Sequence, residues 1–236
     1  MSRFVLVHGA WHGAWCWKKV VPLLEERGHT VVTPTLPLEL GFGAYVNAVS
    51  EALNSAPGQS VLVGHSMAGA VVSQVAEALP EKIERLVFLT AFAPQDGESL
   101  NTLARINLAS ALRDNVVGNE GGTGLVVKPE VIKDCFYHDC SDEDLAWAIE
   151  QLRPQNPEPF GAVLKLTPEG YGSVSKQYIE CVEDQAIHIH LQRVMARQAG
   201  CTLVNSLQTS HSPFLSAPAQ LVAHLATIGI NDARKP

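Results

Sequence analysis

Residues 61–72 read Val61-Leu62-Val63-Gly64-His65-Ser66-Met67-Ala68-Gly69-Ala70-Val71-Val72. A short apolar run passes through small residues directly into a second apolar stretch, with one serine at the change. This pattern is typical of a buried strand that turns sharply into a helix and exposes a serine nucleophile at the turn. A hydroxyl there lies at a helix N-terminus, where backbone N–H groups and the helix dipole favour an oxyanion. The stretch therefore predicts an α/β fold with Ser66 as the nucleophile.

The serine motif departs from its usual form at one position. The final glycine of the pattern Gly-x-Ser-x-Gly is Ala68 here, and Gly69 follows one place later. Alanine is the mildest steric replacement, so Ser66 stays the candidate nucleophile. In the alternative interpretation, Gly64 and Ser66 only form a structural turn between strand and helix.

The rest of the chain repeats the alternation of strand and helix. Short runs rich in β-branched residues alternate with amphipathic stretches of helical period, which predicts βα units around a mostly parallel sheet with helices on both faces. The expected strands are Phe4–Val7, Val31–Thr35, Val61–Val63, Leu86–Thr90, Tyr178–Val182 and Thr202–Leu207. The stretches of helical period are Trp17–Leu24, Tyr45–Leu53, Val71–Leu79 and Leu221–Leu225. We expect an open sheet of about six strands.

Residues 93–172 break this rhythm after the fourth expected strand. An insertion of this length in an α/β sheet is usually a cap over the strand ends, where such folds bind ligands. The sequence therefore predicts a core of residues 1–92 and 173–236 and a cap of residues 93–172, with a separate second domain as the alternative. Within the cap, Ser141 is the expected N-cap of a helix, and residues 156–159 (Asn-Pro-Glu-Pro) are expected to form an extended connector.

The loop after the first strand supplies a candidate oxyanion hole. Phe4–Val7 is followed by His8-Gly9-Ala10-Trp11-His12, and its small residues allow the backbone to approach a substrate carbonyl. We assign the hole to the backbone N–H groups of Ala10 and Met67. His8 and His12 have a spacing that metal sites also use, but they flank a glycine loop and no carboxylate follows them. We therefore expect no metal and no other cofactor.

A serine nucleophile needs a base and an orienting carboxylate, and in this kind of fold they follow the serine in the order acid, histidine. Asp184 comes directly after the expected strand Tyr178–Val182, and His211 follows Thr202–Leu207. We therefore predict Ser66, Asp184 and His211 as the catalytic residues. Glu183 is the alternative acid, and Asp96 is a more distant one.

The remaining histidines fit the role of base less well. His188 and His190 are two residues apart and are expected on a helix surface, and His224 lies inside the last expected helix. His65 adjoins Ser66, but its side chain is expected to point away across the turn.

Composition and charge limit the partners. The 236 residues carry 17 Lys and Arg against 24 Asp and Glu, a net charge of −7, so there is no basic footprint for nucleic acid or anionic lipid. No apolar run predicts an export signal or a membrane span. The five cysteines are scattered without a CxxC pair, which favours a reducing cytoplasm. The sequence leaves a homodimer open.

Taken together, these residues resemble the α/β-hydrolases. Within that family the chain is similar to the branch of plant salicylate-binding methylesterases, hydroxynitrile lyases and bacterial pyrethroid hydrolases. The segments that carry the resemblance are residues 4–17, 64–69 and 178–184 together with His211. The resemblance spans nearly the whole chain and is weaker in the cap. It implies that Ser66, Asp184 and His211 match the family's triad, and that Ala10 and Met67 match its oxyanion-hole donors.

Two departures separate this chain from the lyases of that branch. The lyases carry a threonine where this chain has Gly9, and a lysine directly after the catalytic histidine where it has Ser212. That lysine stabilises the departing cyanide, so its absence favours ester hydrolysis.

The resulting hypothesis is a serine carboxylesterase that hydrolyses a small to medium apolar or aromatic ester through an acyl-enzyme. The expected pocket-lining residues are Trp11, Phe92, Trp147 and Phe214, with Met67 beside them. Three alternatives stay open. They are lactone or carbon–carbon bond hydrolysis on the same triad, hydroxynitrile cleavage, and a small-molecule receptor on a hydrolase fold.

Overall fold

The computed structural model describes residues 1–228 and is built around one six-stranded parallel sheet. The strands are β1 (Arg3–Val7), β2 (Thr30–Val32), β3 (Ser60–His65), β4 (Ile83–Leu89), β7 (Lys176–Cys181) and β8 (Leu203–Leu207). Their order across the sheet is β2-β1-β3-β4-β7-β8. The predicted parallel sheet of about six strands is confirmed. The predicted core runs to residue 236, and its last eight residues lie outside the described part.

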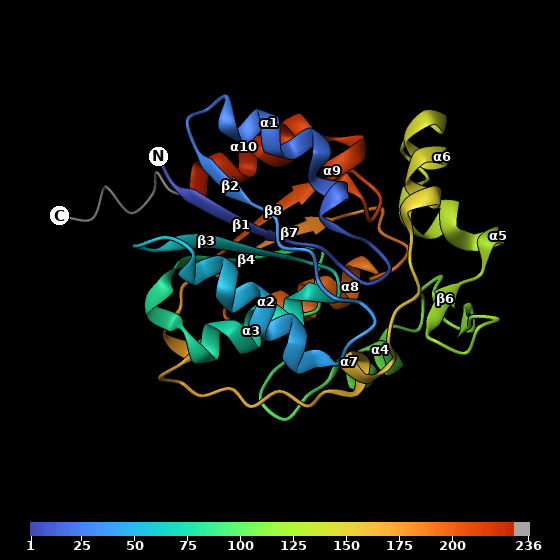
Figure 1. Cartoon of the computed structure of the whole chain (residues 1–236), viewed down its shortest axis with the longest axis horizontal. Helices are drawn as coiled ribbons and strands as arrows, with labels where there is room; N and C mark the ends of the chain where they lie inside the picture. Colours follow the sequence, from blue (N-terminus) through green and yellow to red (C-terminus); the bar gives the residue numbers. More distant parts are fainter. Residues whose placement is uncertain (229–236) are drawn as a thin grey trace.

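Helices cover both faces of the sheet. Figure 1 shows α2 and α3 on one face and α1 and α10 on the other. The α-helices are α1 (Val20–Glu25), α2 (Phe42–Asn54), α3 (Ala68–Ala78), α4 (Leu100–Ile106), α5 (Pro129–Ile132), α6 (Asp142–Gln151), α7 (Glu158–Gly161), α8 (Ile189–Gln198), α9 (Pro213–Ser216) and α10 (Pro218–Ile228). Shorter turns are η1 (Ala14–Lys19), η2 (Pro80–Lys82), η3 (Lys133–Tyr137) and η4 (Tyr171–Ser173).

Burial on both faces explains the composition of the central strands. Every residue of β3 is buried, and in β1 only Arg3 keeps partial exposure. Side chains of a strand alternate between its two faces, so continuous apolar runs such as Phe4–Val7 supply apolar contacts to the helices on each side. The edge strand β2 is shorter than expected, with three residues, and none of them is fully buried.

The middle of the segment between β4 and β7 lies beyond the carboxyl ends of the strands, and its last residues run back to the amino end of β7. Figure 1 shows α5, α6 and β6 on the right, at the end toward which the strands run. The segment includes a two-stranded antiparallel hairpin of β5 (Val116–Gly118) and β6 (Leu125–Val127). It is joined to the loop after β1, because the Trp11 indole N–H donates to Leu125 O (2.9 Å) and Arg153 N donates to Trp11 O (3.0 Å).

Two local expectations in this segment have different outcomes. Ser141 is the N-cap of α6 as predicted, and its hydroxyl accepts a hydrogen bond from Asp144 N (3.2 Å). The prediction of an extended connector at residues 156–159 is wrong, because α7 begins at Glu158. The side chain of Asn156 accepts from Glu158 N (2.9 Å), and Pro157 has helical angles of φ −70° and ψ −23°. Proline suits the start of a helix, so these prolines begin a helical turn instead of preventing one.

No helix within residues 1–228 is long and apolar enough to cross a membrane.

Candidate active site

Ser66 stands at the sharp turn between β3 and α3. Its backbone φ is +56°, a left-handed conformation that is uncommon for a residue with a side chain. The surrounding backbone fixes this conformation: Ser66 N donates to Leu89 O (3.3 Å), and Ser66 O accepts from Gly69 N and Phe92 N (both 3.1 Å). Strain held in this way is typical of functional turns, and it presents the Ser66 side chain to the cavity described below.

Two glycines allow the backbone to approach this turn. A Cβ atom on Gly9 would lie 2.8 Å from Ser66 Cβ, and one on Gly69 would lie 1.8 Å from Phe92 O. The second distance explains why the last glycine of the serine motif is at position 69 and not at position 68. In this chain the closest neighbour of the helix start is the loop at Phe92, which faces Gly69, while Ala68 is fully buried without needing to be glycine.

Asp184 and His211 form a buried hydrogen-bonded pair. Nδ1 of His211 donates to Oδ2 of Asp184 at 2.6 Å, and each residue is about 1% exposed. The Thr90 hydroxyl donates to the same carboxylate oxygen. The other oxygen accepts from the backbone N–H of Ala186 (2.6 Å) and Ile187 (2.9 Å). Asp184 thus accepts four hydrogen bonds. The one from His211 holds the imidazole proton on Nδ1 and leaves Nε2 as an acceptor.

His65 lies closer to this pair than the sequence indicated. Its Nε2–H donates to His211 O (2.9 Å), and the two imidazole rings are 4.6 Å apart. Burial lowers the pKa of His65 well below its usual value, with the neighbouring His211 as a smaller cause, so the ring is neutral. The loop at His211 packs directly against this side chain, a contact that the sequence did not indicate.

The alternative acids and bases lie elsewhere. Asp96 accepts a hydrogen bond from Leu166 N (2.9 Å), and Asp184, not Glu183, is the carboxylate on His211. His188 is the N-cap of α8, where its side chain accepts from the N–H of His190 (3.4 Å). His224 lies within α10, as predicted.

His8 and His12 hold the loop after β1. His8 Nε2 accepts from Leu36 N and its Nδ1–H donates to Gly9 O, both at 2.9 Å. His12 Nδ1–H donates to Ala10 O (2.8 Å), and its Nε2 accepts from the Tyr137 hydroxyl (2.7 Å). Burial lowers the pKa of His8 to about 4 and that of His12 to about 3, so both rings are neutral at pH 7. Over residues 1–228, no three His, Cys, Asp or Glu side chains are grouped to hold a metal ion.

Ala10 and Met67 meet beside Ser66 on the wall of one cavity. Within residues 1–228, neither backbone N–H donates to a protein acceptor. Both residues are buried, at 3% and 1% exposure, and unpaired buried N–H groups are rare unless a ligand or water uses them. The two N–H groups are therefore suited to bind an oxygen atom above Ser66.

The cavity over Ser66 has a volume of about 250 Å³ and mostly apolar walls. Of the four expected lining residues, Trp11 and Phe92 line it, and Met67 does as well. The lining residues that sequence reasoning missed are Leu100, Asn101, Ala104, Asn107, Ser110, Leu112, Arg113, Val116, Leu125, Phe160 and Ala186. Most belong to the segment between β4 and β7. Ser99 and Thr102 form the capping box of α4, so this pair is the feature of the sequence that could have predicted the helix carrying some of these lining residues.

Trp147 and Phe214 lie outside this cavity. Trp147 packs edge-on against Trp15, with ring centroids 5.2 Å apart, and the Lys18 ammonium lies 3.2 Å from its ring. Phe214 is fully buried in the core, edge-on to the His65 ring at 5.0 Å. Its contribution to the site is therefore support of His65 and not contact with a ligand.

Comparison with known proteins agrees with this geometry. The model of the alpha/beta hydrolase family matches residues 4–225. The chain belongs to the alpha/beta hydrolase family. Methylesterase 1 of Arabidopsis thaliana is 33% identical to this hydrolase over 93% of this chain and 93% of its own length.

Solved structures of this family superpose closely on the hydrolase. The crystal structure of polyneuridine aldehyde esterase matches with a TM-score of 0.86 at 30% identity, covering 97% of this chain and 99% of the other. A pyrethroid hydrolase from Sphingobium faniae JZ-2 matches with a TM-score of 0.84 at 28% identity, covering 99% of both chains. These relatives confirm the resemblance and the prediction that this hydrolase is a carboxylic ester hydrolase.

Proposed function

We propose that this hydrolase cleaves a carboxylic ester through an acyl-enzyme on Ser66, with His211 as general base and Asp184 as its orienting acid. The observation that carries the proposal is the 2.6 Å hydrogen bond between His211 Nδ1 and Asp184, in a fold that presents Ser66 to a mostly apolar cavity. This bond leaves Nε2 of His211 free to take a proton.

In the first step, Nε2 of His211 takes the proton of the Ser66 hydroxyl while Oγ bonds to the ester carbonyl carbon. The carbonyl electrons move onto oxygen, and the N–H groups of Ala10 and Met67 bind that oxyanion. Asp184, which accepts four hydrogen bonds, stabilises the imidazolium without taking its proton. The carbon–oxygen bond to the alcohol then breaks, and the leaving alcohol takes the proton from His211.

Hydrolysis of the acyl-enzyme repeats the same steps with water. His211 takes a proton from water as its oxygen bonds to the acyl carbon, and it returns that proton to Ser66 Oγ as the carboxylic acid leaves. No step needs a metal or an organic cofactor.

The substrate class follows from the size of the cavity and from the relatives. A volume of about 250 Å³ with aromatic and aliphatic walls suits the ester of a compact apolar or aromatic acid with a small alcohol. Several relatives are named methylesterases, and we propose that methyl esters of such acids are substrates. Residues 93–172 then act as the cap that encloses the acyl group, since α4 and β6 contribute part of the cavity wall.

We also propose a cytoplasmic location. All five cysteines are free thiols, which fits a reducing compartment.

The test is hydrolysis of p-nitrophenyl acetate, butyrate and octanoate by the wild type and by Ser66→Ala, with Ser55→Ala as a matched control at the end of α2. We expect Ser66→Ala alone to abolish turnover and the shorter chains to be preferred. Turnover that survives in Ser66→Ala would overturn the proposed nucleophile. A folded wild type that is inactive on all three esters and on methyl benzoate would overturn the proposed substrate class.

A further inference from the structure

A second cavity lies away from Ser66 and has a volume of about 520 Å³. It shares no lining residue with the cavity over Ser66. Its walls come from residues 166–168 and 171–176, from the end of α8 and the turn after it at residues 198–200, and from Thr202, Gln95 and Asp96. Lys176 begins β7, whereas Asp184 follows the opposite end of that strand, so the two sites are separated by roughly 16 Å of strand. The cavity therefore belongs to the amino-terminal side of the sheet.

The burial of Lys176 is the feature of this cavity that indicates a ligand. Its side chain is buried, with 5% of the residue exposed, and Nζ donates to Val174 O (2.9 Å) and Gly172 O (3.5 Å). The ammonium lies 4.2 Å from the centre of the Tyr171 ring. Within the described part of the chain, no carboxylate forms an ion pair with it. Lysine is rarely buried without a paired anion, because removing its charge from water is costly.

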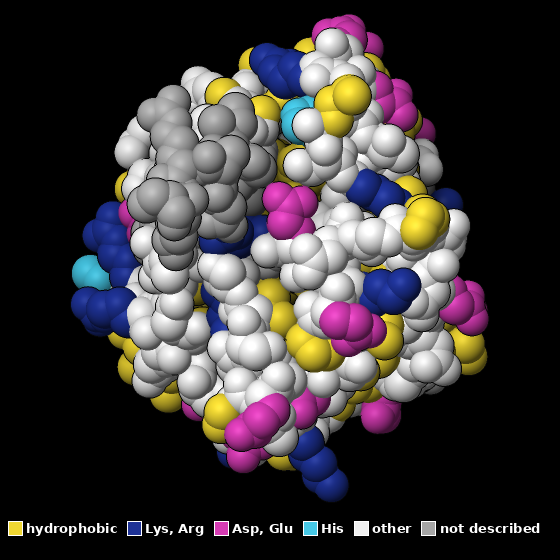
Figure 2. Space-filling view, turned by 90° about the vertical axis from the view of Figure 1, so that its left-hand side faces the viewer, with side chains coloured by type: hydrophobic (Ala, Val, Ile, Leu, Met, Phe, Trp, Pro, Cys, Tyr) yellow, Lys and Arg dark blue, Asp and Glu magenta, His cyan; other side chains and the backbone are white. Residues whose placement is uncertain are grey.

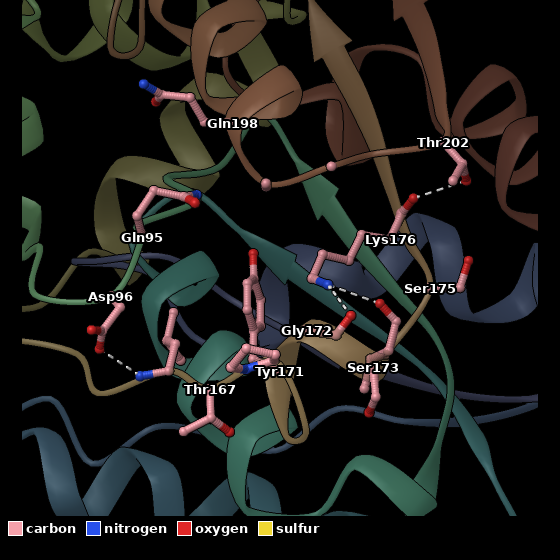
Figure 3. A pocket seen from close by; sticks show the side chains of 15 residues that line it. Gln95, Asp96, Thr167, Tyr171, Gly172, Ser173, Ser175, Lys176, Gln198 and Thr202 are labelled. Carbon is pink, nitrogen blue, oxygen red and sulfur yellow. Dashed lines mark hydrogen bonds between the residues drawn. The ribbon is translucent and has the colours of Figure 1, made fainter.

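The surroundings of Lys176 define the kind of anion that fits. Figure 3 shows Tyr171 standing in the middle of the cavity, with the amine of Lys176 on one side and the Asp96 carboxylate on the other. Asp96 Oδ1 accepts from Leu166 N (2.9 Å), and its negative charge disfavours a second anionic group at that end. The cavity therefore favours a single negative charge next to Lys176.

The rest of the lining supplies apolar surface and neutral polar groups. Leu166, Pro168, Val174 and Ala199 give the cavity an apolar wall beside the Tyr171 ring. Gln95 contributes a buried amide nitrogen that has no hydrogen-bond partner in residues 1–228. A volume of about 520 Å³ with this wall is far more than an inorganic anion fills. A ligand that carries the anionic group on an apolar organic framework fits both the size of the cavity and its apolar wall.

The anion is recognised by groups inside the cavity and not by the electrostatic potential of the surrounding surface. Figure 2 shows the face of the molecule toward which the amino ends of the strands point, and side chains of both charges occur on it. The molecule as a whole carries a net charge of −7. An anion in this cavity is therefore held by the recessed ammonium and not by a basic surface.

We propose that this cavity binds a small organic monocarboxylate, with its carboxylate on the Lys176 ammonium and its apolar body against Tyr171. The ammonium has three N–H donors, and the two backbone carbonyls leave one for the ligand. A charge-assisted hydrogen bond at a buried site gives the selectivity: the carboxylate binds, whereas the neutral amide of the same shape does not.

The first experiment maps binding on the unmodified protein. The ¹⁵N-labelled chain is titrated with 3-phenylpropanoate and, separately, with 3-phenylpropanamide and phthalate, and backbone amide signals are followed by NMR. We expect 3-phenylpropanoate to shift the signals of Gly172, Ser173 and Gly200, with little effect from the amide or the dianion. Shifts confined to Ala10 and Met67 would show binding at the Ser66 cavity only and would overturn the proposal, as would equal binding of the amide.

The second experiment removes the charge. Lys176→Met keeps the length of the side chain, and Lys165→Met is the matched control because Lys165 is exposed and carries the same charge. We expect Lys176→Met to bind 3-phenylpropanoate about tenfold more weakly or worse, with Lys165→Met unchanged. Equal affinity in both variants would overturn the role of Lys176. If Lys176→Met does not fold, the comparison of acid, amide and dianion on the wild type still decides the proposal. Ester hydrolysis is assayed separately, so failure here leaves the proposed function untouched.

Discussion

The Nε2–H of His65 donates to the backbone carbonyl of His211 at 2.9 Å, which ties the residue before Ser66 to the loop that carries the proposed base. The two loops are 146 residues apart in the sequence. The neutral ring of His65, packed between His211 and Phe214, therefore holds the His211 loop against the end of β3.

This relationship predicts a positioning role for His65. His65→Leu removes the hydrogen bond, and we expect kcat for ester hydrolysis to fall about fivefold with little change in KM, because a lost hydrogen bond costs about 1 kcal/mol and loosens the His211 loop. His65→Gln keeps a donor of similar reach and is expected to recover part of the rate. If His65→Leu and His65→Gln lose activity equally, the hydrogen bond is not what matters and ring packing is.

Asp184 is predicted to control the tautomer of His211. In Asp184→Asn, the amide oxygen keeps the backbone N–H donors of Ala186 and Ile187, so the NH2 group faces His211 Nδ1. This group donates instead of accepting, which favours the wrong tautomer of the imidazole. We expect kcat to fall by about 10³–10⁴ while the fold is kept, as measured by turnover and circular dichroism. Glu183→Gln is the matched control, since it removes the neighbouring charge and is expected to leave turnover nearly unchanged. The opposite ranking of the two variants would transfer the role to Glu183.

Gly9 is predicted to tolerate no side chain. A Cβ atom there would lie 2.8 Å from Ser66 Cβ and 3.0 Å from His65 Nδ1, so Gly9→Ala must displace the serine turn or the loop after β1. We expect the rate of ester hydrolysis to fall about 100-fold, and the free energy of unfolding measured by urea titration to fall by about 1–3 kcal/mol. Gly43→Ala is the control, because no atom lies within 4 Å of the Cβ it would add. Full activity in Gly9→Ala would mean that the loop moves freely.

The sequence predicted the parts of the site that strand order constrains. The carboxyl ends of parallel strands meet along one edge of a sheet, so residues directly after Cys181 and Leu207 had to come near the serine turn at the end of β3. The structure indeed places Asp184 and His211 within hydrogen-bonding distance. The same reasoning needs no knowledge of side-chain packing.

The cavity wall could not be predicted in this way. It is built from short elements such as α4 and the β5–β6 hairpin, whose pairing depends on tertiary contacts and not on a periodic pattern. Aromatic residues occur equally in a core and in a pocket. For this reason the sequence wrongly predicted Phe214 and Trp147 as lining residues of the cavity over Ser66. At residues 156–159, a hydrogen bond from Glu158 N to the Asn156 side chain stabilises a helical turn. Composition alone does not reveal this local bond.

The buried histidines predict that the protein loses stability in mild acid. Burial lowers the pKa of His8 to about 4 and of His12 to about 3, while both titrate near 6.5 in the unfolded chain. Between those values the unfolded chain binds more protons than the folded one, so the free energy of unfolding falls as the pH drops below 6.5. We expect each ring to account for about 2 kcal/mol by pH 5, measured by urea unfolding at pH 7 and pH 5.

His8→Gln isolates one ring from the carboxylates that also titrate in acid. Glutamine keeps an acceptor and a donor in this position but cannot be protonated, so the difference in unfolding free energy between wild type and variant should shrink as the pH falls from 7 to 5. Carboxylates contribute equally to both proteins and cancel in that difference. His190→Gln, at an exposed site, is the matched control. If the His8→Gln difference does not change with pH, folding does not lower the pKa of His8, and the loop that presents Ala10 is not held by a ring that stays neutral in acid.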